Sequence, residues 1–166
     1  FLAVAWSDVF QGALMFVGLV FLPLVGLAAA GGWGEVAAGL RAVDPTLLSF
    51  AGPDGWTAVS IAGAIGLSLI GLGFLGSPQI FVRFLSLKSV AEVKPGAAVA
   101  LIWTIFADSG AVVIGLVGRH LLVGRDLGTD GQYVLPLLVE HALPAVLVGL
   151  FIAIVLSSIM STADSL

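Results

Sequence analysis

The residues best suited to bind a ligand lie at the end of the sequence, in the stretch SSIMSTADSL (157–166). On a helix, its hydroxyl residues at positions i, i+3, i+4 and i+7 would share one face; they are Ser158, Ser161, Thr162 and Ser165. Hydroxyl and freed backbone carbonyl oxygens are hard, neutral ligands of the kind that suits Na⁺. The alternative is that the hydroxyls donate to carbonyls one turn earlier, or to a facing helix.

A second stretch, GLGFLGSPQ (71–79), contains G-x-G-x-x-G, the pattern of a dinucleotide-binding turn. That turn follows a short strand and opens a helix, whereas this one closes an apolar run, so the context excludes a nucleotide site. Two interpretations remain. The glycines allow close packing of a neighbouring helix, or Gly71, Gly73, Gly76 and Pro78 break the helix. A Gly/Pro-interrupted span is a sequence marker of transporter binding sites, and we predict a break here.

The composition indicates which elements must position these residues. The chain is 60% hydrophobic and 10% charged, with a mean hydropathy of +1.19, whereas about 25% of the residues of a soluble domain are charged. This is the composition of a membrane protein. The six cations are scattered and the net charge is −4, so no nucleic-acid surface is expected. There is no cysteine for a disulfide or thiolate site.

Four segments are long and apolar enough to cross a bilayer, and lipid requires them to be helices. They cover about 9–30, 56–76, 96–118 and 143–166. The sequence therefore predicts an all-α membrane protein. Because the chain lacks an initiator Met and has apolar runs near both ends, we interpret residues 1–166 as an interior fragment of one transmembrane domain.

The loop charges predict an orientation in a plasma (cytoplasmic) membrane. The segment Ser77–Pro95 carries three cations, Arg83, Lys88 and Lys94, more than either of the other loops. The positive-inside rule places this loop in the cytoplasm and the other two outside. Short helices are expected in the outer loops, over about 34–43 and 132–142.

With these elements in view, SSIMSTADSL, GLGFLGSPQIFVRFLS and AWSDVFQGALM resemble the sodium:solute symporter family, in particular its sodium/proline symporters. The resemblance spans essentially the whole chain and implies a LeuT-like fold of two inverted five-helix repeats. It implies a Na⁺ site in which Ser161 and Thr162 supply side-chain oxygens and Ser158 a backbone carbonyl. The helix that would complete this site is expected upstream of the present chain.

The resemblance also implies that GLGFLGSP forms an unwound helix that binds the solute. The implied solute-binding residues are Gly73, Phe74, Ser77 and Pro78. Phe74 stands where the proline symporters usually have tyrosine, and Ile70 stands where they have tryptophan. The implied solute is proline or a similar neutral amino acid, with a sugar, a carboxylate or a vitamin as alternatives.

Two acids are candidates for coupling or gating. Asp8, in WSDVFQ, matches a family aspartate that affects transport, although a carboxylate beginning a helix is an equal alternative. Asp108 has no counterpart in the resemblance. It lies near the middle of the third predicted span, where charge is costly and usually functional, or it is a structural acid bonded to Ser109 or a neighbouring helix.

Together these patterns predict a secondary active transporter in the lipid bilayer that couples Na⁺ to import of a small organic solute. Alternating access requires no covalent chemistry, so neither an enzyme nor a cofactor other than the coupling ion is expected. A channel is the competing class, but it should have polar residues along a continuous pore. Here the polar groups concentrate at two points of the sequence.

Overall fold

The structure is a computed structural model, and it describes residues 2–164. Within its helices, some residues are described by their backbone alone: Leu2, Ala3, Val4, Phe74, Leu75, Gln79, Arg83, Ser161, Thr162 and Asp164. Three of the predicted site residues, Phe74, Ser161 and Thr162, therefore have side chains that lie outside the described part of the chain.

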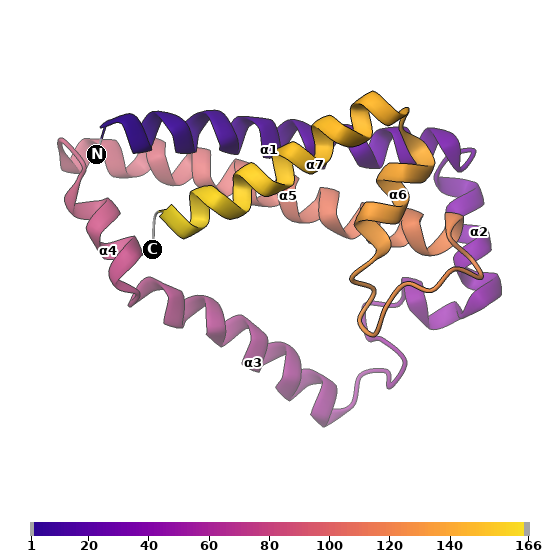
Figure 1. Ribbon diagram of the computed structural model, residues 1–166. Coiled ribbons are helices and arrows are strands. Elements are labelled where there is room, and N and C mark those ends of the chain that lie inside the picture. Colours follow the sequence, from indigo (N-terminus) through magenta and orange to yellow (C-terminus); the bar gives the residue numbers. More distant parts are fainter. Residues whose placement is uncertain (1, 165–166) are drawn as a thin grey trace. The chain divides into compact units, whose positions relative to one another are not determined.

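All regular structure in the described residues is helical (Figure 1), which confirms the all-α prediction. The α-helices are α1 (Leu2–Ala29), α2 (Trp33–Val43), α3 (Ala58–Leu75), α4 (Pro78–Leu85), α5 (Val93–Leu121), α6 (Val134–Ala142) and α7 (Ala145–Asp164). Two short 3₁₀ turns, η1 (Pro45–Leu48) and η2 (Val90–Glu92), precede α3 and α5.

Each of the four predicted spans coincides with a long helix, namely α1, α3, α5 and α7. Two described segments are long and apolar enough to cross a bilayer, Ala5–Ala29 and Val90–Leu121. The apolar parts of α3 and α7, Ala58–Gly73 and Ala145–Met160, are shorter. The structure thus supports two membrane-capable helices of the four expected. The two short helices expected in the outer loops are present as α2 and α6.

The chain divides into two compact units, one formed by Phe1–Leu40 with Ile102–Leu166 and the other by Arg41–Leu101. The boundaries fall inside α2 and α5, so the first turns of α5 belong to the second unit.

In the first unit, α1 is the helix that α5, α6 and α7 contact. Helix α7 packs against α1 at an oblique angle and runs in the opposite direction (Figure 1), and α6 contacts both. The fully buried side chains come from four helices and include Leu22, Val36, Leu40, Val117 and Leu138. Among the described residues, none that is buried as a whole is polar or charged, so apolar packing stabilises this unit.

Glycines allow the helices of this unit to approach closely. At Gly110 of α5, an added methyl group would overlap the backbone carbonyl oxygen of Leu19 in α1. Between the same two helices, the Phe16 and Phe106 rings meet edge to face with centroids 5.9 Å apart. Small residues at helix contacts are typical of membrane proteins, where close van der Waals packing holds helices together.

The second unit contains α3, whose residues Ile61–Gly73 are exposed within the structure. This helix is apolar on all sides, and such a helix is buried in a large core or in a membrane. Ahead of it, the Asp44 carboxylate caps η1 by accepting hydrogen bonds from the hydroxyl and the backbone N–H of Thr46, at 2.7 and 2.8 Å. These bonds lower the pKa of Asp44.

The contact between α1 and α5 predicts that Gly110→Ala destabilises the full-length protein. The added methyl group would force the helices apart, and overpacking of this kind costs about 1–3 kcal/mol. The measurement is the thermal unfolding midpoint of the purified protein in detergent. Gly115→Ala is the matched control, because Gly115 lies on the same helix and a methyl group added there would meet no atom of another helix within 4 Å. Equal midpoints for the two variants would contradict the contact.

Candidate functional site

The predicted break lies at the junction between α3 and α4. Helix α3 continues through Gly71 and Gly73 and ends at Leu75, and α4 begins at Pro78. The prediction of an interrupted helix is therefore confirmed, but the prediction that Gly71 and Gly73 are themselves non-helical was wrong. The non-helical residues are Gly76 and Ser77.

Proline explains why the interruption falls where it does. Pro78 has no N–H to donate to the preceding turn, and its ring disfavours a helical conformation for the residue before it, here Ser77. The N–H of Gly76 turns back to Gly73 O at 3.1 Å, which closes α3. The carbonyl of Ser77 accepts from the N–H groups of Ile80 and Phe81, both at 3.2 Å, which opens α4. The glycines permit this turn, and the proline requires an interruption.

The side chain of Ser77 is the polar group that this junction leaves unsatisfied. Its Oγ is buried and has no hydrogen-bond partner in the described structure. A buried hydroxyl without a partner costs about 1–3 kcal/mol, and such a group at an interrupted helix is suited to bind a polar ligand. Among the four predicted solute-binding residues, the structure brings Gly73, Ser77 and Pro78 to this junction as chain neighbours, with Pro78 exposed. The side chain of the fourth, Phe74, is outside the described residues.

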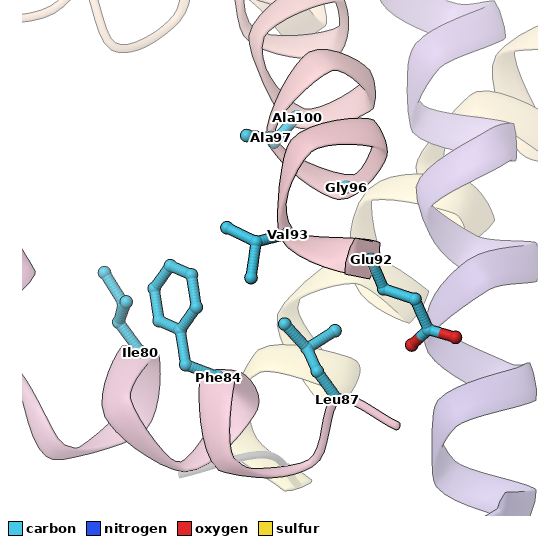
Figure 2. Close-up of a pocket in the computed structure, with 8 residues that line it drawn as sticks. All are labelled: Ile80, Phe84, Leu87, Glu92, Val93, Gly96, Ala97 and Ala100. Carbon is cyan, nitrogen blue, oxygen red and sulfur yellow. The ribbon is translucent and has the colours of Figure 1, made fainter. Parts of the chain in front are cut away.

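A cavity of about 390 Å³ lies further along the same unit, between α4 and the first turns of α5. Figure 2 shows Ile80 and Phe84 directed toward Val93, while the carboxylate of Glu92 extends away from them. The carboxylate accepts a hydrogen bond from the Lys88 N–H at 3.1 Å. The rest of the lining is apolar, and an apolar wall does not compensate the desolvation of an ammonium or a carboxylate. This cavity alone is therefore a poor site for a zwitterionic solute, and none of Gly73, Ser77 and Pro78 lines it.

The predicted sodium-binding residues lie in the last turns of α7, in the first unit. Ser158 is helical and lines a cavity of about 220 Å³ between α1 and α7, together with Met15, Gly18 and Phe151. Residues 161 and 162 continue the same helix. No cluster of three or more His, Cys, Asp or Glu residues that could hold a metal ion occurs among the described residues. A neutral oxygen site for Na⁺ requires no such cluster.

The two candidate acids lie on different helices of the first unit. Asp8 is half-buried inside α1, which begins at Leu2, so the interpretation of Asp8 as the residue that begins a helix was wrong. Asp108 is exposed on α5, next to Ala107, which is buried. Its carboxylate thus lies on a different side of the helix from the residues packed within the unit.

Gln11 has no role in the predictions from the sequence, although it lies in the stretch AWSDVFQGALM. Its side-chain oxygen Oε1 is buried and lacks a hydrogen-bond partner in the structure. Among the described side chains, Gln11 and Ser77 are the two with such an atom. The sequence signal for Gln11 was an isolated amide in an apolar helix. Its burial could not be predicted, because burial depends on packing between helices.

The comparisons with known proteins identify the family. The model of the sodium:solute symporter family matches residues 1–166. The chain belongs to this family.

Relatives with assigned names match over the same region. The high-affinity proline transporter PutP of Bacillus subtilis is 34% identical over 166 residues, which cover 99% of this chain and 34% of that protein. The osmoregulated proline transporter OpuE of the same organism is 30% identical over 99% of this chain and 33% of its own length. A sodium/proline symporter of Staphylococcus aureus is 32% identical over 99% of this chain and 31% of its own. The chain spans about a third of the length of these relatives, and no solved structure matches it significantly.

The junction predicts that Pro78→Ala extends helical hydrogen bonding from α3 into α4. The alanine restores an N–H donor and removes the restriction on Ser77, so amide hydrogen exchange at 76–79 should slow in the full-length protein. Pro95→Ala is the control, because Pro95 lies in the first turn of α5 and outside the junction, so its replacement should leave exchange at 76–79 unchanged. Faster or unchanged exchange at 76–79 in Pro78→Ala would contradict this explanation of the break.

Proposed function

We propose that the full-length protein is a sodium-coupled secondary active transporter that imports proline or a similar small neutral amino acid. One observation carries this proposal: the whole chain matches a sodium-coupled family, and the matching relatives are named for proline transport. Coupling consists of binding and conformational exchange, so the protein is not an enzyme and requires no cofactor beyond the coupling ion.

The solute site is proposed at the α3–α4 junction, formed by Gly73, Phe74, Ser77 and Pro78. The buried, unpartnered Oγ of Ser77 supports this assignment. A hydroxyl can donate to the carboxylate of an amino acid or accept from its ammonium group. The ring of Phe74 would contribute an apolar surface against the aliphatic part of the solute.

The sodium site is proposed on α7, with side-chain oxygens from Ser161 and Thr162 and the backbone carbonyl of Ser158. Neutral oxygens can hold Na⁺ without a fixed negative charge nearby, and the last three turns of α7 carry no Asp, Glu, Lys or Arg before Asp164. Asp8 and Asp108 are proposed to contribute to coupling or gating. Both lie inside segments that are long and apolar enough to cross a bilayer, where ionisable groups are usually functional.

The chain is proposed to be part of one multi-pass transmembrane domain of the plasma membrane with a LeuT-like inverted-repeat fold. In this arrangement α1, α3, α5 and α7 are the spans. The loop that carries Arg83, Lys88 and Lys94 faces the cytoplasm, following the positive-inside rule. The end of α7 then lies in the inner half of the membrane.

A second candidate is sodium symport of another solute, such as a sugar, a carboxylate or a vitamin. It is favoured by Phe74 and Ile70, which depart from the aromatic residues expected at these positions of a proline symporter. Without the tyrosine hydroxyl, the site loses a donor that a buried polar solute would use. A panel of labelled solutes distinguishes the two candidates.

The function is tested with the full-length protein in proteoliposomes and labelled proline. An inward Na⁺ gradient should drive accumulation, and replacing Na⁺ by choline should abolish it. Counterflow of labelled proline against unlabelled proline should occur without a gradient, as expected for a carrier and not for a channel. Accumulation of another member of the solute panel, with proline inactive, would establish the second candidate.

Ser77→Ala should weaken proline binding by about 10-fold, because an unsatisfied buried hydroxyl is removed together with one hydrogen bond to the solute. That loss corresponds to about 1.4 kcal/mol. The thermal unfolding midpoint without solute should not fall, since Oγ has no partner to lose. Competition binding measures the affinity, with Ser68→Ala as the control on α3, where Oγ donates to Ala64 O at 2.9 Å. Equal affinities for the wild type and Ser77→Ala would contradict the proposed contact.

Replacing Ser161 and Thr162 together by Ala should raise the Na⁺ concentration needed for half-maximal uptake. Expression should change little, because a hydrogen bond between membrane helices contributes about 0.6 kcal/mol on average. Uptake is measured over a range of Na⁺ concentrations at a fixed proline concentration. Wild-type sodium dependence at normal expression would refute the assigned sodium site.

A further inference from the structure

The side chain of Gln11 is the feature that the proposed sodium and solute sites do not use. Its Oε1 is buried and has no donor in the described structure, although an amide oxygen can accept two hydrogen bonds. Leaving such an acceptor unsatisfied costs about 1–3 kcal/mol. A hydrophobic side chain of the same size would avoid that cost, so a ligand-bound state in which Oε1 gains a donor would explain the glutamine.

Gln11 lies on the side of α1 that packs against α7. It precedes Gly18 by seven residues, which is two helical turns, and Gly18 is buried against Phe151. A methyl group added at Gly18 would lie 3.2 Å from the ring of Phe151. Met15, one turn after Gln11 on the same face, lines the α1–α7 cavity with Ser158. The amide therefore shares the helix face that is directed at α7.

The register of the two helices places Gln11 at the depth of the hydroxyl residues. Because α1 and α7 run in opposite directions (Figure 1), seven residues back from Gly18 correspond to seven residues forward from Phe151. That position is Ser158, the first residue of the hydroxyl face. Gln11 Oε1 is thus a buried acceptor on the helix opposite a turn of α7 that is rich in hydroxyl donors.

Sodium binding changes what a hydroxyl needs from its surroundings. A serine or threonine that coordinates Na⁺ directs its oxygen lone pairs at the ion, so its proton points away and requires an acceptor. Such outer partners orient the ligating groups of metal sites, and their loss typically weakens metal binding 10–100-fold. Without the ion, the hydroxyl can donate to the carbonyl one turn earlier on its own helix, which leaves the opposing acceptor unsatisfied.

We propose that Gln11 is a positioning residue for the sodium site, and that its Oε1 accepts the proton of an α7 hydroxyl when that hydroxyl coordinates Na⁺. The proposal rests on the proposed sodium site. It makes α1 a sensor of sodium occupancy, because the hydrogen bond between α1 and α7 exists only in the sodium-bound protein. Sodium binding then tightens the α1–α7 contact through the chain's own side chains.

The test compares Gln11→Leu, which removes the acceptor, with Gln11→Glu, which keeps an acceptor oxygen. The first readout is the increase in the thermal unfolding midpoint of the purified full-length protein over a range of Na⁺ concentrations, which reports binding without transport. Gln11→Leu should need about 10–100-fold more Na⁺ for the same increase. Its midpoint without Na⁺ should equal or exceed that of the wild type. Gln11→Glu should respond at wild-type Na⁺ concentrations or below.

A merely structural role would give the opposite pattern, with a lower midpoint in the absence of Na⁺ and an unchanged sodium dependence. Phe10→Leu is the matched control, since Phe10 is the neighbouring residue of α1 and is exposed. If Gln11→Leu does not fold, Gln11→Asn withdraws the oxygen by one methylene and provides the same comparison.

The Ser161→Ala/Thr162→Ala variant separates this inference from the proposed function. If that variant loses the sodium response while Gln11→Leu keeps the wild-type response, the sodium site stands and the role of Gln11 is refuted. If the double variant keeps the wild-type response, the proposed sodium site itself is wrong. Loss in both variants, with recovery in Gln11→Glu, supports the proposal.

Discussion

The constraint on which the structure depends is that backbone polar groups in hydrocarbon must be satisfied within the chain. Helices meet it along almost all of the apolar sequence. The junction between α3 and α4 is the exception within an apolar segment, because Pro78 has no N–H and Ser77 leaves the helix. A membrane protein tolerates such an exception where the freed groups face a cavity or a ligand. The buried Oγ of Ser77 has no hydrogen-bond partner among the described residues, and a bound ligand would supply one.

In the first unit, close contacts between helices determine which polar residues lie near one another. Close approaches allow α5 and α7 to lie against α1: Gly110 of α5 meets the Leu19 backbone, and Gly18 of α1 meets the Phe151 ring of α7. These contacts fix the register of the helices. That register sets the depth along α1 at which the hydroxyl residues of α7 lie. It also brings the amide of Gln11 to the same depth. Small residues thereby determine which polar residues meet, although they carry no chemistry themselves.

Much of this could be predicted from the sequence. The long helices follow from apolar runs, because length and hydropathy are local properties. The exact site of the break did not follow, since glycines allow a turn at several positions and only the residue before Pro78 is forced out of the helix. Helix α4, Pro78–Leu85, was missed because its eight residues lie in the segment that the loop charges assigned to a cytoplasmic loop. Burial of Gln11 depends on the register between two helices, which no single segment encodes.

Amide hydrogen exchange of the full-length protein can be measured with no ligand, with Na⁺ and with Na⁺ plus proline. It shows whether the hydroxyl residues of α7 bind Na⁺ and whether the α3–α4 junction binds the solute. Exchange reports local opening of each helix separately. We expect Na⁺ alone to slow exchange in α7 from Ser158 onward. We expect proline with Na⁺ to slow exchange at Ile80 and Phe81, whose N–H groups donate to Ser77 O. Unchanged exchange at these two amides under saturating proline and Na⁺ would contradict this expectation.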